Sequence, residues 1–142
     1  MPNIVMVSGG YDPVHVGHIR QFKEASKYGK VIVVLNSDEW LLRKKDYIFM
    51  TYEERKEILQ SIKYVYRVFP QIGHEDTMKE SILRYKPTHF AKGGDRTPNN
   101  MPSEELDACE QVDCEIIYGV GGGKVQSSSW LIDKLKEKVR RN

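Results

Sequence analysis

The stretch GGYDPVHVGH, residues 9–18, decides the fold of this chain because it joins the first expected strand to the first expected helix. The apolar run Ile4–Val7 before it is rich in β-branched residues and predicts a short buried strand. From Gly17 onwards, apolar or small residues recur at helical spacing and predict a helix. A glycine-rich turn in this place lets an anion approach the free backbone N–H groups at the helix start. The stretch therefore predicts an anion-binding turn.

The same stretch holds two histidines, His15 and His18, at a three-residue spacing. A first helical turn would place both imidazoles on one face of the helix. Two imidazole donors beside a helix N-terminus can hold phosphate oxygens, and they hold them more strongly as negative charge builds up. We therefore expect a phosphate site at this turn.

The composition is typical of a globular protein and argues against several other classes. The chain has 142 residues, of which 39% are hydrophobic and 30% charged, enough for one domain with a core. Its net charge of +2 is too small for a nucleic-acid-binding surface. We see no apolar run of membrane-spanning length and no signal peptide, so no membrane partner is expected. Cys109 and Cys114 lack a CxxC spacing, which favours reduced thiols, a cytoplasmic location and no metal site of their own.

Strands and helices are expected to alternate along the chain. Apolar runs predict further strands at residues 31–35, 65–69, 88–91 and 115–118. Helices are predicted at residues 52–62, 75–85 and 103–111 and from residue 128, with Thr51 and Ser127 as N-caps. The alternation implies parallel strands. We expect one α/β domain over residues 1–142, a doubly wound, Rossmann-like five-stranded parallel sheet with helices on both faces. Ligands of such sheets bind beyond the strand C-termini, which the loops at residues 9–18, 36 and 93 follow.

The turn resembles the signature of the nucleotidyltransferase superfamily named for its cytidylyltransferases, Gly-x-Phe-Asp-x-x-His-x-Gly-His. Tyr11 takes the aromatic position, and Asp12, His15, Gly17 and His18 match directly. The match is specific because the type, spacing and context of five positions agree. The residues that the resemblance implies at the nucleotide phosphates are Gly9, Gly10, Tyr11, Asp12 and Gly17, with His15 and His18 as catalytic donors.

Two polar segments resemble further parts of this family. Residues 36–45 resemble the loop that supplies a phosphate-binding lysine, in which Lys44 fits best as a catalytic residue and Lys45 as an acceptor-binding one. A solvated basic loop is the alternative interpretation. Residues 52–65 are similar to glycerol-3-phosphate cytidylyltransferases, and Arg55 is the side chain there that we expect to reach an acceptor phosphate.

Two glycine-rich segments carry the rest of the resemblance. Lys92-Gly93-Gly94-Asp95 resembles the turn by which heptose-phosphate adenylyltransferases approach the nucleotide. Residues 121–129 do not form a P-loop, because the four-residue gap between glycines is missing and Val125 follows the lysine. They resemble the family's final loop, in which a Ser-Thr-Thr cluster caps the last helix beside the triphosphate. The residues in these places are Lys124, Ser127, Ser128 and Ser129, and an ordinary N-cap at Ser127 is compatible with this role.

Departures from the family leave the identity of the acceptor open. Glycerol-3-phosphate cytidylyltransferases have an arginine before the serine cluster, where this chain has glycines and Lys124, and lysine cannot make the two-pronged contact of arginine. Tyr66 and Arg67 stand where relatives have an aspartate that helps to recognise the acceptor. Arg96 replaces an aromatic residue, and residues 97–102 have the pattern of an inserted loop. We expect Tyr66 and Arg96 to contribute to a pocket for a different phosphorylated acceptor.

The reaction implied by the resemblance is nucleotidyl transfer. An acceptor phosphate oxygen attacks the α-phosphate of a nucleoside triphosphate, and pyrophosphate leaves with a divalent cation such as Mg²⁺. We expect Mg²⁺ to arrive on the triphosphate, with Asp12 orienting either the turn or a metal-bound water. Residues 52–59 and the compact length favour CTP and an acceptor such as glycerol 3-phosphate. Residues 92–95 favour the alternative, ATP with a heptose 1-phosphate-like sugar.

Other interpretations compete with this one. A catalytically weak nucleotide-binding module would fit the missing arginine and the replaced aspartate. The His-x-Gly-His pattern also occurs in class I aminoacyl-tRNA synthetases, but this chain lacks their second, lysine-rich signature and is too short for an anticodon domain. Relatives in the superfamily are commonly dimers, so the resemblance implies a homodimer.

Overall fold

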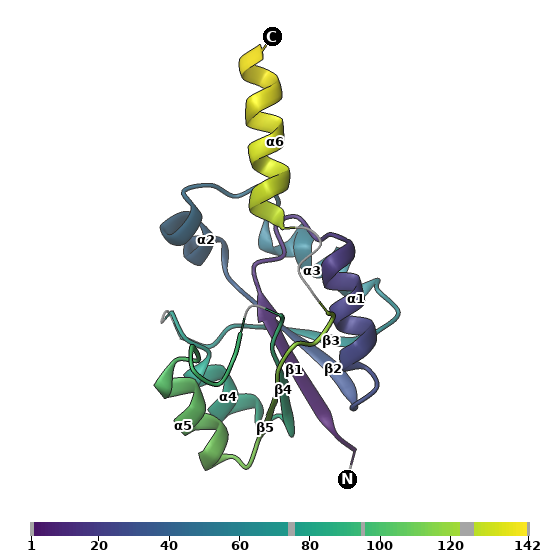
Figure 1. The fold of residues 1–142 in the computed structure, drawn as a ribbon, viewed down its shortest axis with the longest axis vertical. Helices are drawn as coiled ribbons and strands as arrows, with labels where there is room; N and C mark the ends of the chain where they lie inside the picture. Colours follow the sequence, from purple (N-terminus) through teal and green to yellow (C-terminus); the bar gives the residue numbers. More distant parts are fainter. Residues whose placement is uncertain (1, 74–75, 95, 123–126, 142) are drawn as a thin grey trace.

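The computed structural model describes residues 2–73, 76–94, 96–122 and 127–141, which form a layered α/β domain (Figure 1). Five strands pair in parallel in the order β3–β2–β1–β4–β5, with β1 at the centre. The strands are β1 (Ile4–Gly9), β2 (Lys30–Leu35), β3 (Val65–Pro70), β4 (His89–Ala91) and β5 (Glu115–Ile117). The expected five-stranded parallel sheet is confirmed.

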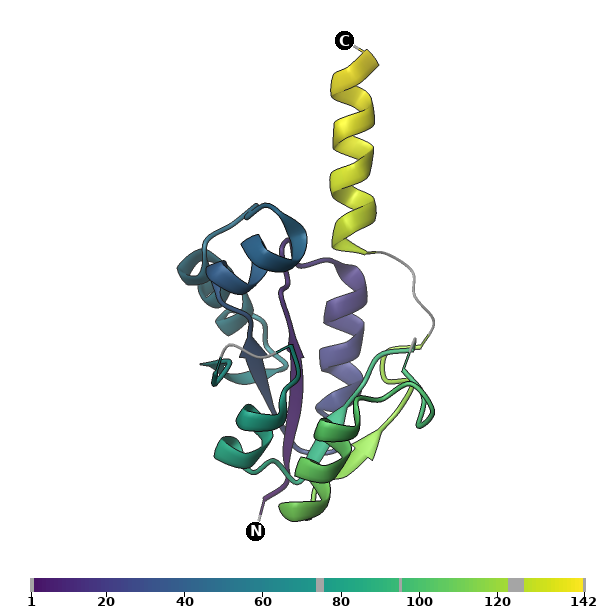
Figure 2. The same ribbon diagram turned by 90° about the vertical axis from the view of Figure 1, so that its left-hand side faces the viewer.

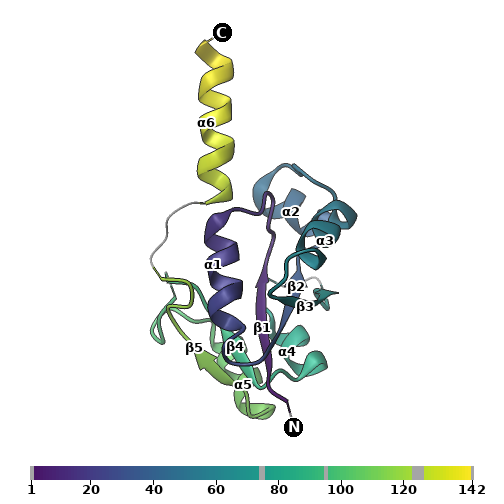
Figure 3. The same ribbon diagram turned by 90° about the vertical axis from the view of Figure 1, so that its right-hand side faces the viewer.

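Helices cover both faces of the sheet, as expected (Figures 2 and 3). They are α1 (Val16–Ala25), α2 (Asp38–Lys45), α3 (Tyr52–Gln60), α4 (Lys79–Tyr85), α5 (Ser103–Gln111) and α6 (Ser128–Arg141). Successive strand residues point to opposite faces. Val7 of β1 therefore packs in one cluster with Phe22 of α1 and Leu59 of α3, whereas Met6 packs in the other with Ile82 of α4. Each of these side chains is fully buried, which stabilises the fold by about 1.5–3 kcal/mol apiece.

Helix α2 lies where the sequence was interpreted as a loop. Its hydrophobic pattern is weak, because Leu41 is its one buried residue among those described. Its end signals are strong: the Ser37 hydroxyl accepts a hydrogen bond from the Trp40 N–H at 3.0 Å, and Asp46 closes the helix in a left-handed conformation with φ 68°. Acids fill the first turn of α2 and basic residues its last turn, as the helix dipole favours. The capping signals rather than the apolar spacing therefore identify this helix.

Smaller differences concern the ends of elements. Helix α4 begins at Lys79 rather than at residue 75, and α1 ends at Ala25, which leaves Tyr28 42% exposed. Strand β3 extends one residue beyond the expected range 65–69, to Pro70, because β3 is an edge strand in which a missing N–H is tolerated. None of these shifts moves an expected element to another place in the fold.

Helix α6 stands away from the body, beyond the C-terminal ends of the strands (Figures 1, 2 and 3). Ser128, Ser129 and Lys136 contact the rest of the described chain, whereas Leu135 and Val139 are 52% and 66% exposed. No helix in the described ranges is both long enough and apolar enough to cross a membrane.

The sheet order places a crevice above the centre of the fold. From β1 the chain runs first to β2 and β3 on one side and later to β4 and β5 on the other. The loops after β1 and β4 therefore diverge, and this switch point is where ligands of open α/β sheets bind.

Candidate active site

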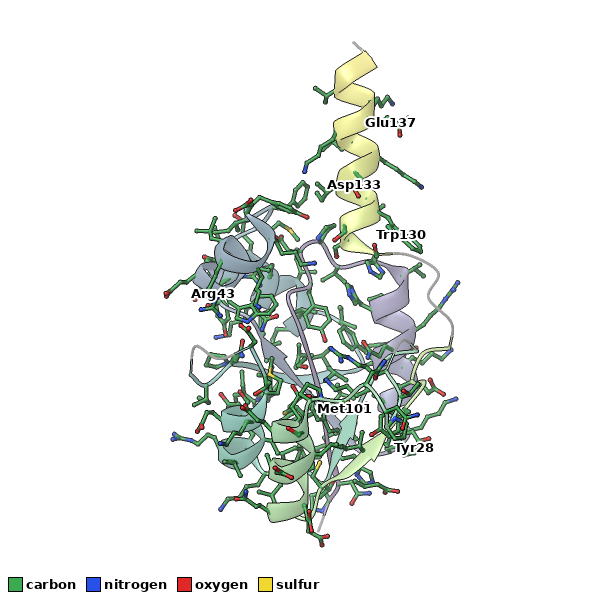
Figure 4. All side chains as sticks on the ribbon, turned by 60° about the vertical axis from the view of Figure 1, so that its left-hand side comes forward. Tyr28, Arg43, Met101, Trp130, Asp133 and Glu137 are labelled. Carbon is green, nitrogen blue, oxygen red and sulfur yellow. The ribbon has the colours of Figure 1, made fainter. Side chains whose placement is uncertain are left out.

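A pocket of about 560 Å³ opens at this switch point, a size usual for small-molecule sites. Its walls come from the turn after β1, the start of α1, α2 with its following loop, the loops after β4 and β5, and the base of α6. Figure 4 shows Arg43 on α2 and Trp130 at the base of α6. The expected site residues that line the pocket are Gly9, Gly10, Tyr11, Asp12, His15, Gly17, His18, Lys45, Gly93, Gly94, Arg96, Ser127, Ser128 and Ser129. Asp95 and Lys124 lie outside the described residues.

The two histidines are fixed by the backbone of the turn. His15 is the N-cap of α1, and its Nδ1 accepts a hydrogen bond from the Gly17 N–H at 3.1 Å. The His18 Nδ1 accepts one from the His15 N–H at 3.2 Å, and the two rings stack with centroids 3.8 Å apart. A ring nitrogen that accepts carries no proton, so each neutral imidazole has its proton on Nε2. The turn thus presents two Nε2–H donors.

Burial keeps His18 neutral. Desolvation, and after it the charge of His15, lower the pKa of His18 from 6.5 to about 3. The ring of Tyr11 packs edge-on against it at 4.7 Å, and Tyr11 is itself 4% exposed. At neutral pH His18 therefore acts as a hydrogen-bond donor without a positive charge of its own.

Helix N-termini supply the positive potential of the pocket. α1 and α6 are the described helices whose first turn holds no acid, whereas the first turns of α2, α3, α4 and α5 each hold at least one. The N-termini of α1 and α6 both border the pocket, to which the first turn of α2 also contributes Trp40 and Leu41. The partial positive charge of these two ends is therefore not compensated within the helix and is available to an anion.

Asp12 anchors the loop after α2. One carboxylate oxygen accepts from the Phe49 N–H and the other from the Met50 N–H, both at 2.7 Å, and the residue is 6% exposed. Asp12 is the one acid among the described lining residues. No group of three or more potential metal ligands occurs in the described part of the chain. With both oxygens engaged, Asp12 fits a role in orienting the turn better than direct metal ligation.

The two adjacent lysines of α2 point to different places. Lys45 lines the pocket, and its Nζ lies 3.4 Å from the Ser129 hydroxyl at the base of α6. Lys44 instead pairs with Asp76 at 2.7 Å and does not line the pocket. The structure thus places Lys45, rather than Lys44, at the pocket.

Arg55 is not in a position to reach an acceptor. It is completely buried and donates to the carbonyl oxygens of Met50, Gly10 and Asn36 at 2.8–3.0 Å, and to the Asp38 carboxylate at 2.7 Å. These bonds join the ends of β1 and β2 to α2 and the loop after it. We therefore correct the acceptor-binding expectation for Arg55 to a structural one.

Two further side chains also lie outside the pocket. Tyr66 is near the beginning of β3, at the opposite end of the sheet, with Lys30 and Arg67 over its ring. Lys92 turns away towards α5, where its Nζ pairs with the Glu105 carboxylate at 3.3 Å. Burial lowers the pKa of Lys92, and the Glu105 charge opposes that shift. For Tyr66 and Lys92 the structure thus contradicts the expected direct contacts, although Gly93 and Gly94 do line the pocket.

The serine cluster caps α6 and ties its start to the turn after β1. Ser127 accepts from the Trp130 N–H at 3.0 Å as the N-cap of α6, and the Ser128 hydroxyl donates to the Pro13 carbonyl at 2.7 Å. Just before the cluster, Gly121 adopts a φ of +92°, and a Cβ there would lie 3.0 Å from the Gln21 Cα. Its N–H donates to the Glu24 carboxylate. A glycine is required here because the loop passes so close to α1.

Arg96 supplies a second cation to the pocket. Its side chain donates to the Asn100 carbonyl at 2.8 Å, and Asn100 in turn accepts from the Thr97 N–H through its side chain. The loop expected as an insertion is thus a closed turn that holds Arg96 at the pocket. Lys45 follows β2 and Arg96 follows β4, so they approach the pocket from either side of the central strand β1. They are the lysine and arginine side chains among the described lining residues.

Sequence comparison agrees with this geometry. The family model for cytidylyltransferase-like proteins matches residues 6–135, and the chain belongs to this family. It is 31% identical over 113 residues to an FAD synthase of Archaeoglobus fulgidus, covering 79% of this chain and 80% of that protein. It is 35% identical over 92 residues to the glycerol-3-phosphate cytidylyltransferase of Bacillus subtilis, covering 64% and 70%.

The chain also resembles part of one larger protein and the whole of one solved structure. The chain is 33% identical over 135 residues to the bifunctional protein HldE of Geobacter metallireducens, covering 93% of this chain but 26% of that protein. Among solved structures, it resembles a lipopolysaccharide core biosynthesis protein from Thermoplasma volcanium with a TM-score of 0.69 and 25% identity, covering 87% of this chain and all of that one. The expected resemblance to nucleotidyltransferases is confirmed, and the chain is an enzyme of this type.

Proposed function

We propose that this enzyme joins a nucleoside monophosphate to a small phosphorylated acceptor and releases pyrophosphate. One observation carries the proposal: two imidazole donors and two acid-free helix N-termini converge on a pocket that also holds Lys45 and Arg96. These groups suit a polyphosphate and a second phosphate together. An acceptor phosphate oxygen attacks the α-phosphorus, and the bond from that phosphorus to the bridging oxygen of pyrophosphate breaks.

The residues divide the work by position. His15 and His18 donate from Nε2 to the α-phosphate and the bridging oxygen, where charge develops in the transition state. The base of α6, with Ser127, Ser128 and Ser129, binds the β- and γ-phosphates, and the glycine turn Gly9–Gly10 admits them close to the backbone. No side chain is needed as a nucleophile because the acceptor phosphate is already an anion, so catalysis is positioning and charge stabilisation.

The remaining roles follow from the same geometry. Lys45 holds the acceptor phosphate against the nucleotide, and Arg96 approaches from the β4 side. Asp12 orients the turn, and a divalent cation such as Mg²⁺, carried by the triphosphate, would neutralise part of its charge. Gly93 and Gly94 offer backbone groups to the base of the nucleotide. CTP remains favoured over ATP by the similarity to glycerol-3-phosphate cytidylyltransferases, with ATP as the alternative.

The test compares the two neighbouring lysines. Pyrophosphate release is measured with Mg²⁺, CTP or ATP, and a panel of phosphorylated acceptors. Lys45→Ala is expected to lower kcat/KM about 10–100-fold, the loss of one charge-assisted contact, whereas Lys44→Ala is the matched control because its exposed pair with Asp76 contributes about 1 kcal/mol or less. His18→Ala should lower turnover by about 10²–10³. Equal effects of the two lysine variants would refute the placement of the acceptor phosphate.

The same assay addresses the catalytically weak binding module. That alternative predicts calorimetric binding of CTP or ATP without pyrophosphate release for any acceptor. The bonded, preorganised histidine pair favours an active enzyme instead.

We also propose a homodimer in the cytoplasm. Exposed Leu135 and Val139 lie one helical turn apart on α6 and offer an apolar strip to a second copy, in keeping with dimeric relatives. Cys109 and Cys114 are buried and unpaired, which supports a reducing compartment. Light scattering on the wild type and on Leu135→Glu tests the dimer, since the variant should be monomeric.

A further inference from the structure

One side of the pocket is a wall of large apolar side chains. Trp40 and Leu41 of α2 and Tyr47 of the loop after it line the pocket beside Lys45. The other side is mainly backbone, from glycines 93, 94, 121 and 122 after β4 and β5. The proposed function puts the nucleotide base against the glycines and the acceptor phosphate at Lys45. The aromatic wall therefore faces the body of the acceptor.

Polar groups on this wall are mostly used within the protein. The side-chain amide of Asn36 donates to Gln71 at 2.6 Å, and the Asn36 carbonyl accepts from the buried Arg55. Both oxygens of Asp12 hold the loop after α2. The indole N–H of Trp40 and the hydroxyl of Tyr11, which also lines the pocket, are exceptions, because neither has a partner among the described residues. A flexible chain of hydroxyls would find few partners here, and a buried hydroxyl without a partner is costly.

The wall is also held in place. The Lys136 ammonium of α6 lies 5.6 Å from the centre of the Tyr47 ring, and Lys45 reaches Ser129 on the same helix. These contacts join the loop after α2 to the base of α6. A wall fixed in this way can bind a rigid ligand with little loss of side-chain entropy.

We propose that the acceptor is a phosphorylated molecule built on a ring, and that the ring packs against Trp40 and Tyr47 while Lys45 binds its phosphate. Aromatic walls suit the flat ring of a flavin phosphate and the C–H face of a sugar phosphate alike. A linear acceptor such as glycerol 3-phosphate would cover little of this wall. The inference rests on the proposed function, because that function assigns this side of the pocket to the acceptor.

The experiment measures pyrophosphate release by the full chain with Mg²⁺ and CTP or ATP. The three acceptors are flavin mononucleotide, mannose 1-phosphate and glycerol 3-phosphate. Trp40→Leu and Tyr47→Leu keep apolar bulk but remove the ring, and each should raise the KM of the ring acceptor about tenfold while the KM of the nucleotide stays within about twofold. Tyr28→Leu is the control, since Tyr28 is exposed beyond the end of α1, away from the pocket (Figure 4).

The outcomes separate the two proposals. Turnover of flavin mononucleotide or of mannose 1-phosphate that depends on Trp40 supports a ring-containing acceptor and shows whether the ring is a flavin or a sugar. Fastest turnover of glycerol 3-phosphate, with an acceptor KM unchanged in both leucine variants, overturns it. No pyrophosphate release with any combination of nucleotide and acceptor would refute the proposed function. Calorimetry with the two ring phosphates would then decide the inference: binding weakened by Trp40→Leu supports it, and no binding overturns it.

Discussion

Replacing Arg55 by lysine tests whether this arginine is structural or binds a ligand. The guanidinium makes four hydrogen bonds that spread over three carbonyl oxygens and the Asp38 carboxylate. Lysine keeps the charge but has one nitrogen, and from one point it can satisfy about two of these four acceptors. Each buried acceptor left without a partner costs about 1–3 kcal/mol. We therefore expect Arg55→Lys to lower the free energy of unfolding by about 2–6 kcal/mol, a large part of the stability of an ordinary domain.

The assay is urea denaturation followed by circular dichroism, with Arg43→Lys as the matched control. Arg43 carries the same change on an exposed side chain that pairs with Asp76, and lysine can still make that pair, so its loss should be within about 0.5 kcal/mol. A loss of less than about 1 kcal/mol in Arg55→Lys, with an unchanged m-value, would refute the structural role. An acceptor KM raised in a variant of normal stability would show instead that Arg55 binds the acceptor.

Three further changes probe the site. Asp12→Asn replaces one of the two acceptors that hold the loop after α2, so it should lower the free energy of unfolding in urea by about 1–3 kcal/mol. The control is Asp46→Asn, at an exposed left-handed position that asparagine tolerates, which should leave this free energy almost unchanged. Equal losses in the two variants would contradict the anchoring role of Asp12. Gly121→Ala should lower the free energy of unfolding by about 1–3 kcal/mol and weaken nucleotide binding in calorimetry, because the new Cβ would meet the backbone of Gln21. Its control is Gly119→Ala, which has open space around it and should lower the free energy of unfolding by about 1 kcal/mol at most and leave nucleotide binding unchanged. The folded-state pKa of His18 is depressed from 6.5 to about 3, so its contribution to stability is complete above pH 6.5 and is lost as the pH falls towards 3, because the unfolded state then binds a proton that the folded state does not. The loss is at most about 1.4 kcal/mol per pH unit, and unfolding experiments at about pH 7 and pH 5 should show it in the wild type and not in His18→Gln; parallel pH dependence would contradict the burial of a neutral His18.

The architecture could be predicted because it depends on patterns that are local in sequence. Runs of β-branched residues such as Val31–Leu35 fix the strands, and their alternation with helices leaves little choice but a parallel sheet. Helix α2 was not predicted because its sequence signals are its caps and end charges, whereas its apolar pattern is nearly absent. The extent of α4 was overestimated because periodicity alone does not mark where a helix begins.

The site could be predicted in its backbone but not in all of its side chains. The turn of residues 9–18, the Gly93–Gly94 pair and the serine cluster all line the pocket, because strand ends fix where such loops lie. The directions of Lys44 and Lys45 depend on the rotation of a helix that the apolar spacing did not reveal, and neighbouring residues on a helix point about 100° apart. Arg55 and Lys92 are basic residues near a phosphate site, but each has buried partners elsewhere, the Asp38 and Glu105 carboxylates.

A charge pattern that the sequence contains would have located the anion site with less ambiguity. Acids in the first turn stabilise a helix by compensating its dipole, and four of the six helices in the described part of the chain have them. The two without them, α1 and α6, forgo that local stabilisation, and both of their N-termini border the pocket. An acid at Val16 or at Ser129 would occupy the potential that a phosphate needs. We therefore expect Ser129→Asp, at the half-buried start of α6, to leave the free energy of unfolding unchanged or slightly higher while it weakens calorimetric binding of the nucleoside triphosphate about tenfold or more. Nucleotide binding as tight as in the wild type would show that the end of α6 does not face the phosphates.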